Sequence, residues 1–105
     1  MIPPVSTMAA LANETRATIL DRLSSGEKTV GELADGLPVS RPAISQHLRV
    51  LENAKLVSEE FRGTRHVYRI DLTGFGTVRM WLDRFWNKRL DAFEQHFRAR
   101  KKETR

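Results

Sequence analysis

Polar and basic side chains gather on one side of the segment between Ser40 and Ala54, and their types suit contact with a nucleic acid. Ile44, Leu48 and Leu51 recur three or four residues apart, which predicts a helix that buries this side. The residues left facing outward near its amino-terminal half are Arg41, Pro42, Ser45, Gln46 and Arg49. Glutamine can pair bidentately with adenine, serine can donate to or accept from several bases, and arginine can bind guanine or phosphate. The pattern predicts a helix for the major groove of duplex DNA, with an ordinary solvated helix face as the alternative.

Two more residues of this segment are candidate DNA contacts. Ser40 can accept a backbone hydrogen bond and begin the helix, which places it at the end that should approach DNA. His47 falls between the inner and outer sides of the helix. Packing with a hydrogen bond and a direct DNA contact therefore both stay open for His47.

A second basic cluster lies in residues 61–69, which hold three arginines and no acid. Arg62 and Arg65 flank the Gly63-Thr64 pair, a composition that suits the tip of a tight hairpin. A basic tip can contact a minor groove or the flanking phosphates, so we count Arg62, Thr64 and Arg65 as candidate DNA contacts. Because two glutamates stand on the preceding strand, only the tip should touch DNA. A charged edge strand that merely resists aggregation is the alternative.

Enzymatic chemistry finds little support in the sequence. Gly63 and the Gly74/Gly76 pair lack the spacing of a phosphate-binding loop, and no carboxylate pair is set in an evident cleft. Ser45 and His47 are two residues apart on a helix, so their side chains point in different directions. The absence of cysteine from the sequence excludes disulfides, thiolate metal sites and cysteine nucleophiles. We therefore predict neither an enzyme nor a cofactor.

Length and composition predict one small folded domain, covering residues 1–105. The 18 Lys and Arg against 13 Asp and Glu give a net charge of +5, but most of this excess lies in residues 98–105, so a nucleic-acid prediction must rest on the local clusters. No stretch is apolar enough for a membrane helix, and the first residues lack the basic start of a secretory signal. These features suit a cytoplasmic protein.

The expected elements follow from apolar spacing, caps and breakers. Asn13, Ser40 and Thr73 can each cap a helix, and residues 29–32 have the Thr-x-x-Glu form of a capping box. Helices are expected at about 5–12, 14–25, 29–36, 40–54 and 74–100, and strands at 56–62 and 65–71. The fold class is mainly α with a β-hairpin, in the order α-α-α-α-β-β-α. Two short helices at about 29–54 form a helix-turn-helix, and the hairpin at about 56–71 makes the winged variant.

These residues resemble a known family. The sequence GELADGLPVSRPAISQHLRVLENAKLV at 31–57, followed by FRGTRHVYRID at 61–71, is similar to the ArsR/SmtB winged-helix transcriptional regulators. The opening at 11–16 also looks like the start of that family, and the similarity spans about residues 8–97. The resemblance implies a homodimeric repressor that binds a near-palindromic operator on double-stranded DNA and releases it on meeting an effector. By resemblance, the contacts to bases come from Arg41, Ser45, Gln46 and Arg49, and the wing contacts from Arg62 and Arg65.

The metal sites of that family are where this sequence departs from its pattern. Thiolate sensors carry cysteines in the helix that corresponds to residues 30–36, and this chain has none. The spacing of the second site type falls here on Asp83, Phe85, His96 and Ala99, so two of four ligands match. Because a structural zinc ion takes four ligands, we expect no metal site. The stretch 81–91 looks closer to the metal-independent branch, and a sensor using Asp83 and His96 or a protein-interaction module are the alternatives.

The expected last helix carries more aromatic surface than one small domain can bury. Together with the first helix it therefore predicts a two-fold dimer interface, since a few buried aromatic rings contribute several kcal/mol. The predicted dimerisation residues are Met8, Leu11, Val78, Trp81, Leu82, Phe85, Trp86 and Phe93. A pocket for a small-molecule effector, lined by Trp81 and Trp86, is a second possible use of these side chains.

Overall fold

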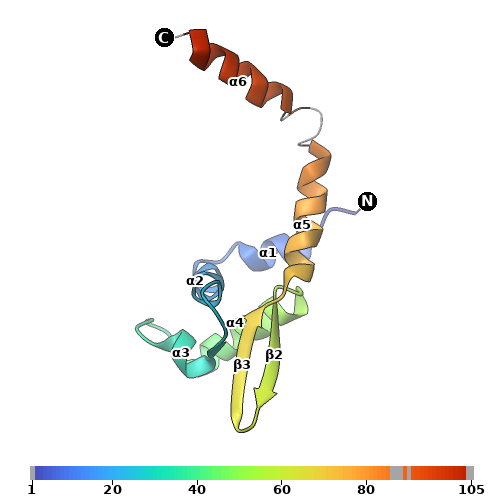
Figure 1. Ribbon diagram of the computed structural model, residues 1–105. Coiled ribbons are helices and arrows are strands. Elements are labelled where there is room, and N and C mark those ends of the chain that lie inside the picture. Colours follow the sequence, from blue (N-terminus) through green and yellow to red (C-terminus); the bar gives the residue numbers. More distant parts are fainter. Residues whose placement is uncertain (1, 86–88, 90, 104–105) are drawn as a thin grey trace.

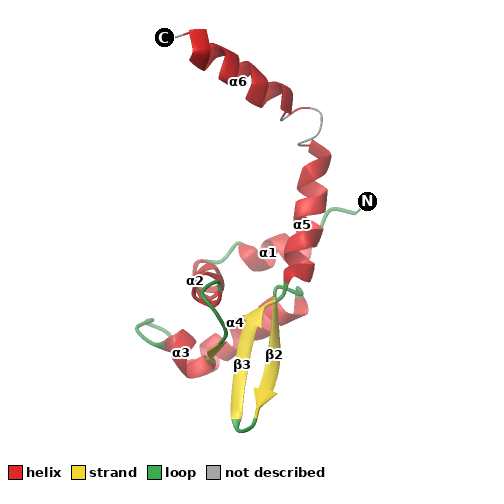
Figure 2. Cartoon of the chain, in the orientation of Figure 1, coloured by secondary structure: helices red, strands yellow, loops and turns green. Residues whose placement is uncertain are grey.

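The computed structural model describes residues 2–85, 89 and 91–103 of the chain. Its helices and strands, in chain order, are α1 Val5–Leu11, α2 Glu14–Leu23, β1 Lys28–Thr29, α3 Val30–Ala34, α4 Arg41–Asn53, β2 Val57–Arg62, β3 Arg65–Ile70, α5 Leu72–Phe85 and α6 Asp91–Glu103. Figures 1 and 2 show the first four helices gathered around the upper part of a β-hairpin. This mainly helical architecture with an antiparallel hairpin confirms the predicted winged helix-turn-helix.

Three predicted caps set the starts of the helices that build the helix-turn-helix region. The Asn13 side chain accepts a hydrogen bond from the backbone N–H of Arg16 at 3.0 Å, and Ser40 Oγ accepts one from Ala43 at 3.2 Å. At α3 the capping box is complete, because Thr29 Oγ1 accepts from the Glu32 N–H while Glu32 Oε1 accepts from the Thr29 N–H. Each bond satisfies a backbone donor that the first turn of a helix leaves free.

The sheet has three strands in the order β1-β3-β2, all antiparallel. The two strands of the hairpin were expected, and they pair from Val57 opposite Ile70 to Arg62 opposite Arg65. Strand β1 was not expected, because two residues are too few to show an alternating pattern. It places Lys28 opposite Tyr68 and so ties the start of the helix-turn-helix to the wing.

One apolar core holds α2, α3, α4 and the hairpin together. Its fully buried side chains are Ile19, Leu33, Ile44, Leu48, Leu51, Leu56, Val57 and Val67. Three of them are the α4 residues whose spacing predicted a buried side. Burying them together fixes the rotation of α4 about its own axis, because a helix can turn only one stripe toward the core.

The start of the carboxyl-terminal helical region differs from the prediction in its cap. Asp71, rather than Thr73, supplies the cap: Asp71 Oδ1 accepts a hydrogen bond from the Thr73 N–H at 2.9 Å, and the helix begins at Leu72. Helices α5 and α6 cover both ends of the single helix expected at 74–100, and residues 86–88 and 90 between them lie outside the described part of the chain.

Helices α5 and α6 give the molecule its length. Figure 1 shows α5 rising beside α1 and α6 extending beyond it, and the molecule measures 59 × 36 × 23 Å. Phe93 and Phe97 of α6 are both exposed, so these two rings do not pack α6 against the rest of the described chain. No helix within the described ranges is both long enough and apolar enough to cross a membrane.

Candidate nucleic-acid interface

Helix α4 presents a polar surface opposite the core. Ile44, Leu48 and Leu51 are at most 1% exposed, and they fasten one side of the helix. The residues expected to face outward are all exposed: Arg41, Pro42, Ser45, Gln46 and Arg49. Because the capped start of α4 carries most of them, the exposed polar groups lie at the end of the helix that can reach base edges in a major groove.

A glycine in α3 makes room for Arg41. A Cβ atom placed on Gly31 would lie 3.1 Å from Nη2 of Arg41, which is tighter than ordinary van der Waals contact. The guanidinium of Arg41 therefore lies against the first turn of α3, where any larger residue than glycine would push on it. Sequence reasoning did not single out Gly31, since a contact between two helices leaves no local signal.

Ser40 and His47 both make contacts within the protein. Ser40 is exposed and caps α4, as described above. His47 is half-buried, and its Nδ1 lies 3.3 Å from Nη1 of Arg16, whose Nε also donates to the backbone oxygen of Ala10 at 2.7 Å. Since a guanidinium can only donate, the contact requires Nδ1 of His47 to accept. Of the two roles left open for His47, the hydrogen-bonded one is observed.

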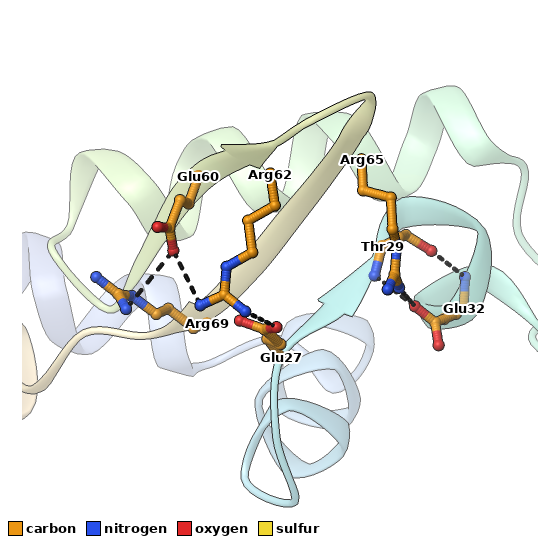
Figure 3. Close-up of polar contacts among 7 residues, drawn as sticks. All are labelled: Glu27, Thr29, Glu32, Glu60, Arg62, Arg65 and Arg69. Carbon is orange, nitrogen blue, oxygen red and sulfur yellow. Dashed lines mark hydrogen bonds and ion pairs between the residues drawn. The ribbon is translucent and has the colours of Figure 1, made fainter.

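The wing presents an exposed tip with arginines on both sides. Gly63 adopts a left-handed φ of 62°, which glycine adopts without strain, and Thr64 beside it is exposed. The side chains of Arg62 and Arg65 are 53% and 63% exposed. Figure 3 shows both arginines turned toward carboxylates of neighbouring segments.

Each arginine of the wing is paired with an acid. Nη1 of Arg62 pairs with Oε1 of Glu27, and its Nη2 lies 3.4 Å from Glu60. Arg69 lies 3.7 Å from the same Glu60 oxygen, and Arg65 lies 3.4 Å from Oε1 of Glu32. The window 61–69 looks basic in the sequence because two of these three acids come from residues more than 30 positions away.

The outer part of the hairpin also carries an aromatic cluster. The rings of Phe61 and His66 stack with centroids 4.2 Å apart, and Oε2 of Glu59 lies 2.9 Å from His66 Nε2 and 3.1 Å from the hydroxyl of Tyr68. Burial, reinforced by the hydrogen bond to Glu59, raises the pKa of Tyr68 to about 12. This cluster joins side chains of the two strands that carry the basic tip.

Comparison with known proteins shows which family the chain belongs to. Residues 13–59 match the family described as "Bacterial regulatory protein, arsR family". The chain is 51% identical over 92 residues to the HTH-type transcriptional regulator Rv2034 of Mycobacterium tuberculosis, covering 88% of this chain and 86% of that protein. It is 34% identical to the transcriptional repressor SdpR of Bacillus subtilis, covering 75% of this chain and 88% of that protein. The chain belongs to the ArsR family.

A solved structure supports the same assignment at the level of the fold. The ArsR-like transcriptional regulator from Rhodococcus sp. RHA1 superimposes with a TM-score of 0.72 at 36% identity, covering 88% of this chain and 90% of that one. ArsR-family regulators bind DNA and commonly act as dimers. This chain is accordingly a DNA-binding transcriptional regulator and not an enzyme.

The predicted dimerisation residues of this ArsR-family chain lie on α1, α5 and α6. Met8, Leu11, Val78 and Trp81 are half-buried, and Leu82, Phe85 and Phe93 are exposed; Trp86 lies outside the described residues. Leu72, Met80 and Phe97 add further exposed apolar surface on the same helices. Large apolar side chains thus remain open to solvent along the two carboxyl-terminal helices of the single chain.

Two alternative sites of the ArsR-family chain fall on the same helices. Asp83 on α5 and His96 on α6 are both exposed, and no three His, Asp or Glu residues gather as a metal site within residues 2–85, 89 and 91–103. Trp81 packs edge-on against Phe85, with ring centroids 5.0 Å apart. The suggested effector pocket also requires Trp86, which is not among the described residues.

Proposed function

We propose that two copies of this regulator bind a near-palindromic operator as a homodimer, with the α4 helices in successive major grooves about one helical turn apart. The observation that carries the proposal is the outward, exposed placement of Arg41, Ser45 and Gln46 on a helix whose other side is locked in the core. Apart from Pro42 in the first turn, the residues on that side are polar or basic as far as Arg49, so it suits a polar groove better than a protein partner.

The proposed contacts divide into two groups. Arg41, Ser45 and Gln46 determine sequence preference, because their side chains can form base-specific hydrogen bonds. Arg49, Arg62 and Arg65 supply affinity through phosphates, which carry no sequence information. Ser40, Pro42, His47 and Thr64 border these residues and complete the proposed interface.

The proposed dimer forms through α1, α5 and α6. Support comes from the exposed apolar side chains of α5 and α6, including Leu82 and Phe85, each 49% exposed. Covering this surface with a second copy would remove it from water, which stabilises association. The two-fold symmetry of such a dimer would match the symmetry of a palindromic operator.

Repression is the proposed outcome of binding. The similar protein SdpR is named a transcriptional repressor, and a regulator that covers its operator can block transcription there. We further propose a cytoplasmic location, where a bacterial genome is accessible, and an unidentified small-molecule effector, which the family resemblance implies.

Selection of bound sites from a random pool of duplex DNA tests the proposal. We expect enrichment of an inverted repeat whose half-site centres lie about 10 base pairs, or one helical turn, apart. Sedimentation of the protein with the enriched duplex should give two chains per duplex. Enrichment of a single unrepeated half-site, or no enrichment at all, would contradict the proposal.

A further inference from the structure

The wing of the free protein is close to electrically neutral, although its tip is the proposed phosphate contact. All three arginines of the wing at about 56–71 have carboxylate partners, contributed by Glu27, Glu32 and Glu60. Both terminal nitrogens of Arg62 are engaged, Nη1 by Glu27 and Nη2 by Glu60. A phosphate that replaces either of these contacts on Arg62 must displace a glutamate.

The glutamates are held in place by the fold. Glu27 directly precedes β1, whose pairing with β3 brings it to the wing (Figure 3). Glu32 Oε1 accepts the backbone N–H of Thr29 at 2.9 Å and lies 3.4 Å from Nη2 of Arg65. The capping box that begins α3 thus also aims a carboxylate at the wing, and its hydrogen bonds lower the pKa of Glu32, which keeps the group charged.

We propose that Glu27 and Glu32 compete with DNA phosphates for Arg62 and Arg65, so that the wing binds DNA by exchanging one anion for another. The inference rests on the proposed function, in which the wing contacts phosphates, and names two residues that set how strongly it does so. Both pairs are at least one-third exposed, and ion pairs of this kind shift an equilibrium by at most about fivefold. The competition therefore weakens DNA binding without preventing it.

A double-mutant cycle on Glu27 and Arg62 tests the competition. The four proteins are the wild type, Glu27→Gln, Arg62→Gln and the double variant, each checked for an unchanged melting transition. Their affinity for a fluorescent duplex of random sequence, about 30 base pairs long, is measured at about 0.1 M salt, where charges beyond about 10 Å are screened. Asp21→Asn, which removes an exposed α2 acid without an ion pair among the described residues, is the matched control.

We expect Glu27→Gln to raise affinity about two- to fivefold in the wild-type background and to have no effect beside Arg62→Gln. An equal gain in both backgrounds would show general charge repulsion and would overturn the inference, as would no gain in the wild type. If Arg62→Gln alone leaves affinity unchanged, the proposed phosphate contact of the wing is itself wrong. These results separate failure of the competition from failure of the proposed function.

A second cycle on Glu32 and Arg65 provides an independent check. Glutamine at position 32 can keep the capping box, because Gln serves there as well as Glu, while removing the charge that faces Arg65. Glu32→Gln should raise affinity up to about fivefold, and only when Arg65 is present. A gain that survives Arg65→Gln would overturn the competition at this pair.

Discussion

Gln46 is the residue on which the proposed sequence preference depends most. It is exposed on α4, while Ile44 and Leu48 on either side of it in sequence are buried. Because a glutamine amide can pair with one base, Gln46→Ala should change preference at one or two base pairs and cost about 1–3 kcal/mol at the enriched site. Competition between that site and random duplex DNA measures the change. Equal weakening on both DNAs would mean that Gln46 does not contact a base.

Arg65 should behave differently, because a phosphate contact is the same on every sequence. Arg65→Ala is expected to weaken enriched and random duplexes by similar factors and to reduce the slope of log affinity against log salt by about one. Titrations at several salt concentrations measure that slope. A selective loss on the enriched site would instead place Arg65 at a base edge.

Tyr68 links the wing to the stability of the fold. Its pKa is raised from 10.0 to about 12 in the folded protein, chiefly by burial, so folding favours the neutral phenol. This contribution is complete below pH 10 and is lost as the pH rises through 12, which means that alkali should destabilise the fold. Tyr68 is the only tyrosine of the chain, so the absorbance of tyrosinate reports its ionisation directly.

We expect the folded protein to show tyrosinate only well above pH 10. Between pH 9 and 11, a range that includes the ordinary tyrosine pKa of 10.0, the Tyr68→Phe variant should lose less free energy of unfolding than the wild type. Urea unfolding across this range is the measurement. Ionisation of Tyr68 at its ordinary pKa in the folded protein would contradict the expectation.

At the level of elements, the junction between α4 and α5 depends on one glycine. A Cβ on Gly74 would lie 2.5 Å from the carbonyl oxygen of Ala54 and 2.7 Å from that of Lys55. The Gly74 N–H donates to the same Lys55 oxygen at 2.7 Å, so a backbone hydrogen bond connects α5 to the end of α4 at this close approach. Gly74→Ala must move one helix and should cost about 1–3 kcal/mol of unfolding free energy.

Gly76 offers a matched control in the same helix. Nothing lies within 4 Å of a Cβ placed there, so Gly76→Ala should stabilise α5 by up to about 1 kcal/mol through helix propensity alone. Urea unfolding of both variants gives the comparison. The close approach at position 74 would be disproved if the two alanines had the same effect.

Elements whose signals are local were the ones that could be predicted. The caps at Asn13 and Ser40, the capping box at 29–32 and the hairpin tip at Gly63 each depend on residues within a few positions of one another. Strand β1 could not be predicted in this way, since it exists only because β3 offers it distant partners. Lys28 pairs with Tyr68, 40 residues later, and Thr29 pairs with Val67, 38 residues later.

The candidate site divides along the same line. The exposure of Gln46 and Arg49 could be predicted from helical spacing, because the side of α4 that is buried determines which residues face solvent. The pairing of Arg62 with Glu27 and the contact of Arg16 with His47 join residues 35 and 31 positions apart. Such contacts depend on how the elements pack, and spacing within one element holds no information about them.

For the whole molecule, the decisive feature is the apolar surface of α5 and α6. Leu82 and Phe85 are each 49% exposed in the single chain, at positions where the proposed dimer would cover them. Leu82→Glu would place a carboxylate in the interface from both copies, which should raise the dimer dissociation constant by at least about a hundredfold. Thr77→Glu adds the same charge at another exposed position of α5 and is the control. Sedimentation measures both, and a wild type that is monomeric at micromolar concentration would remove the proposed interface.

Loss of the dimer should also change DNA binding, and the change distinguishes the contribution of dimerisation from that of the α4 contacts to DNA. In a dimer, one bound α4 holds the other near its half-site, so the second contact forms at a high effective concentration. A Leu82→Glu monomer keeps the exposed residues of α4, which lie on another helix, and should therefore bind an isolated half-site as the wild-type monomer does. Its affinity for the full inverted repeat should fall toward that half-site value. Equal affinity of wild type and Leu82→Glu for the full repeat would mean that each copy binds DNA independently.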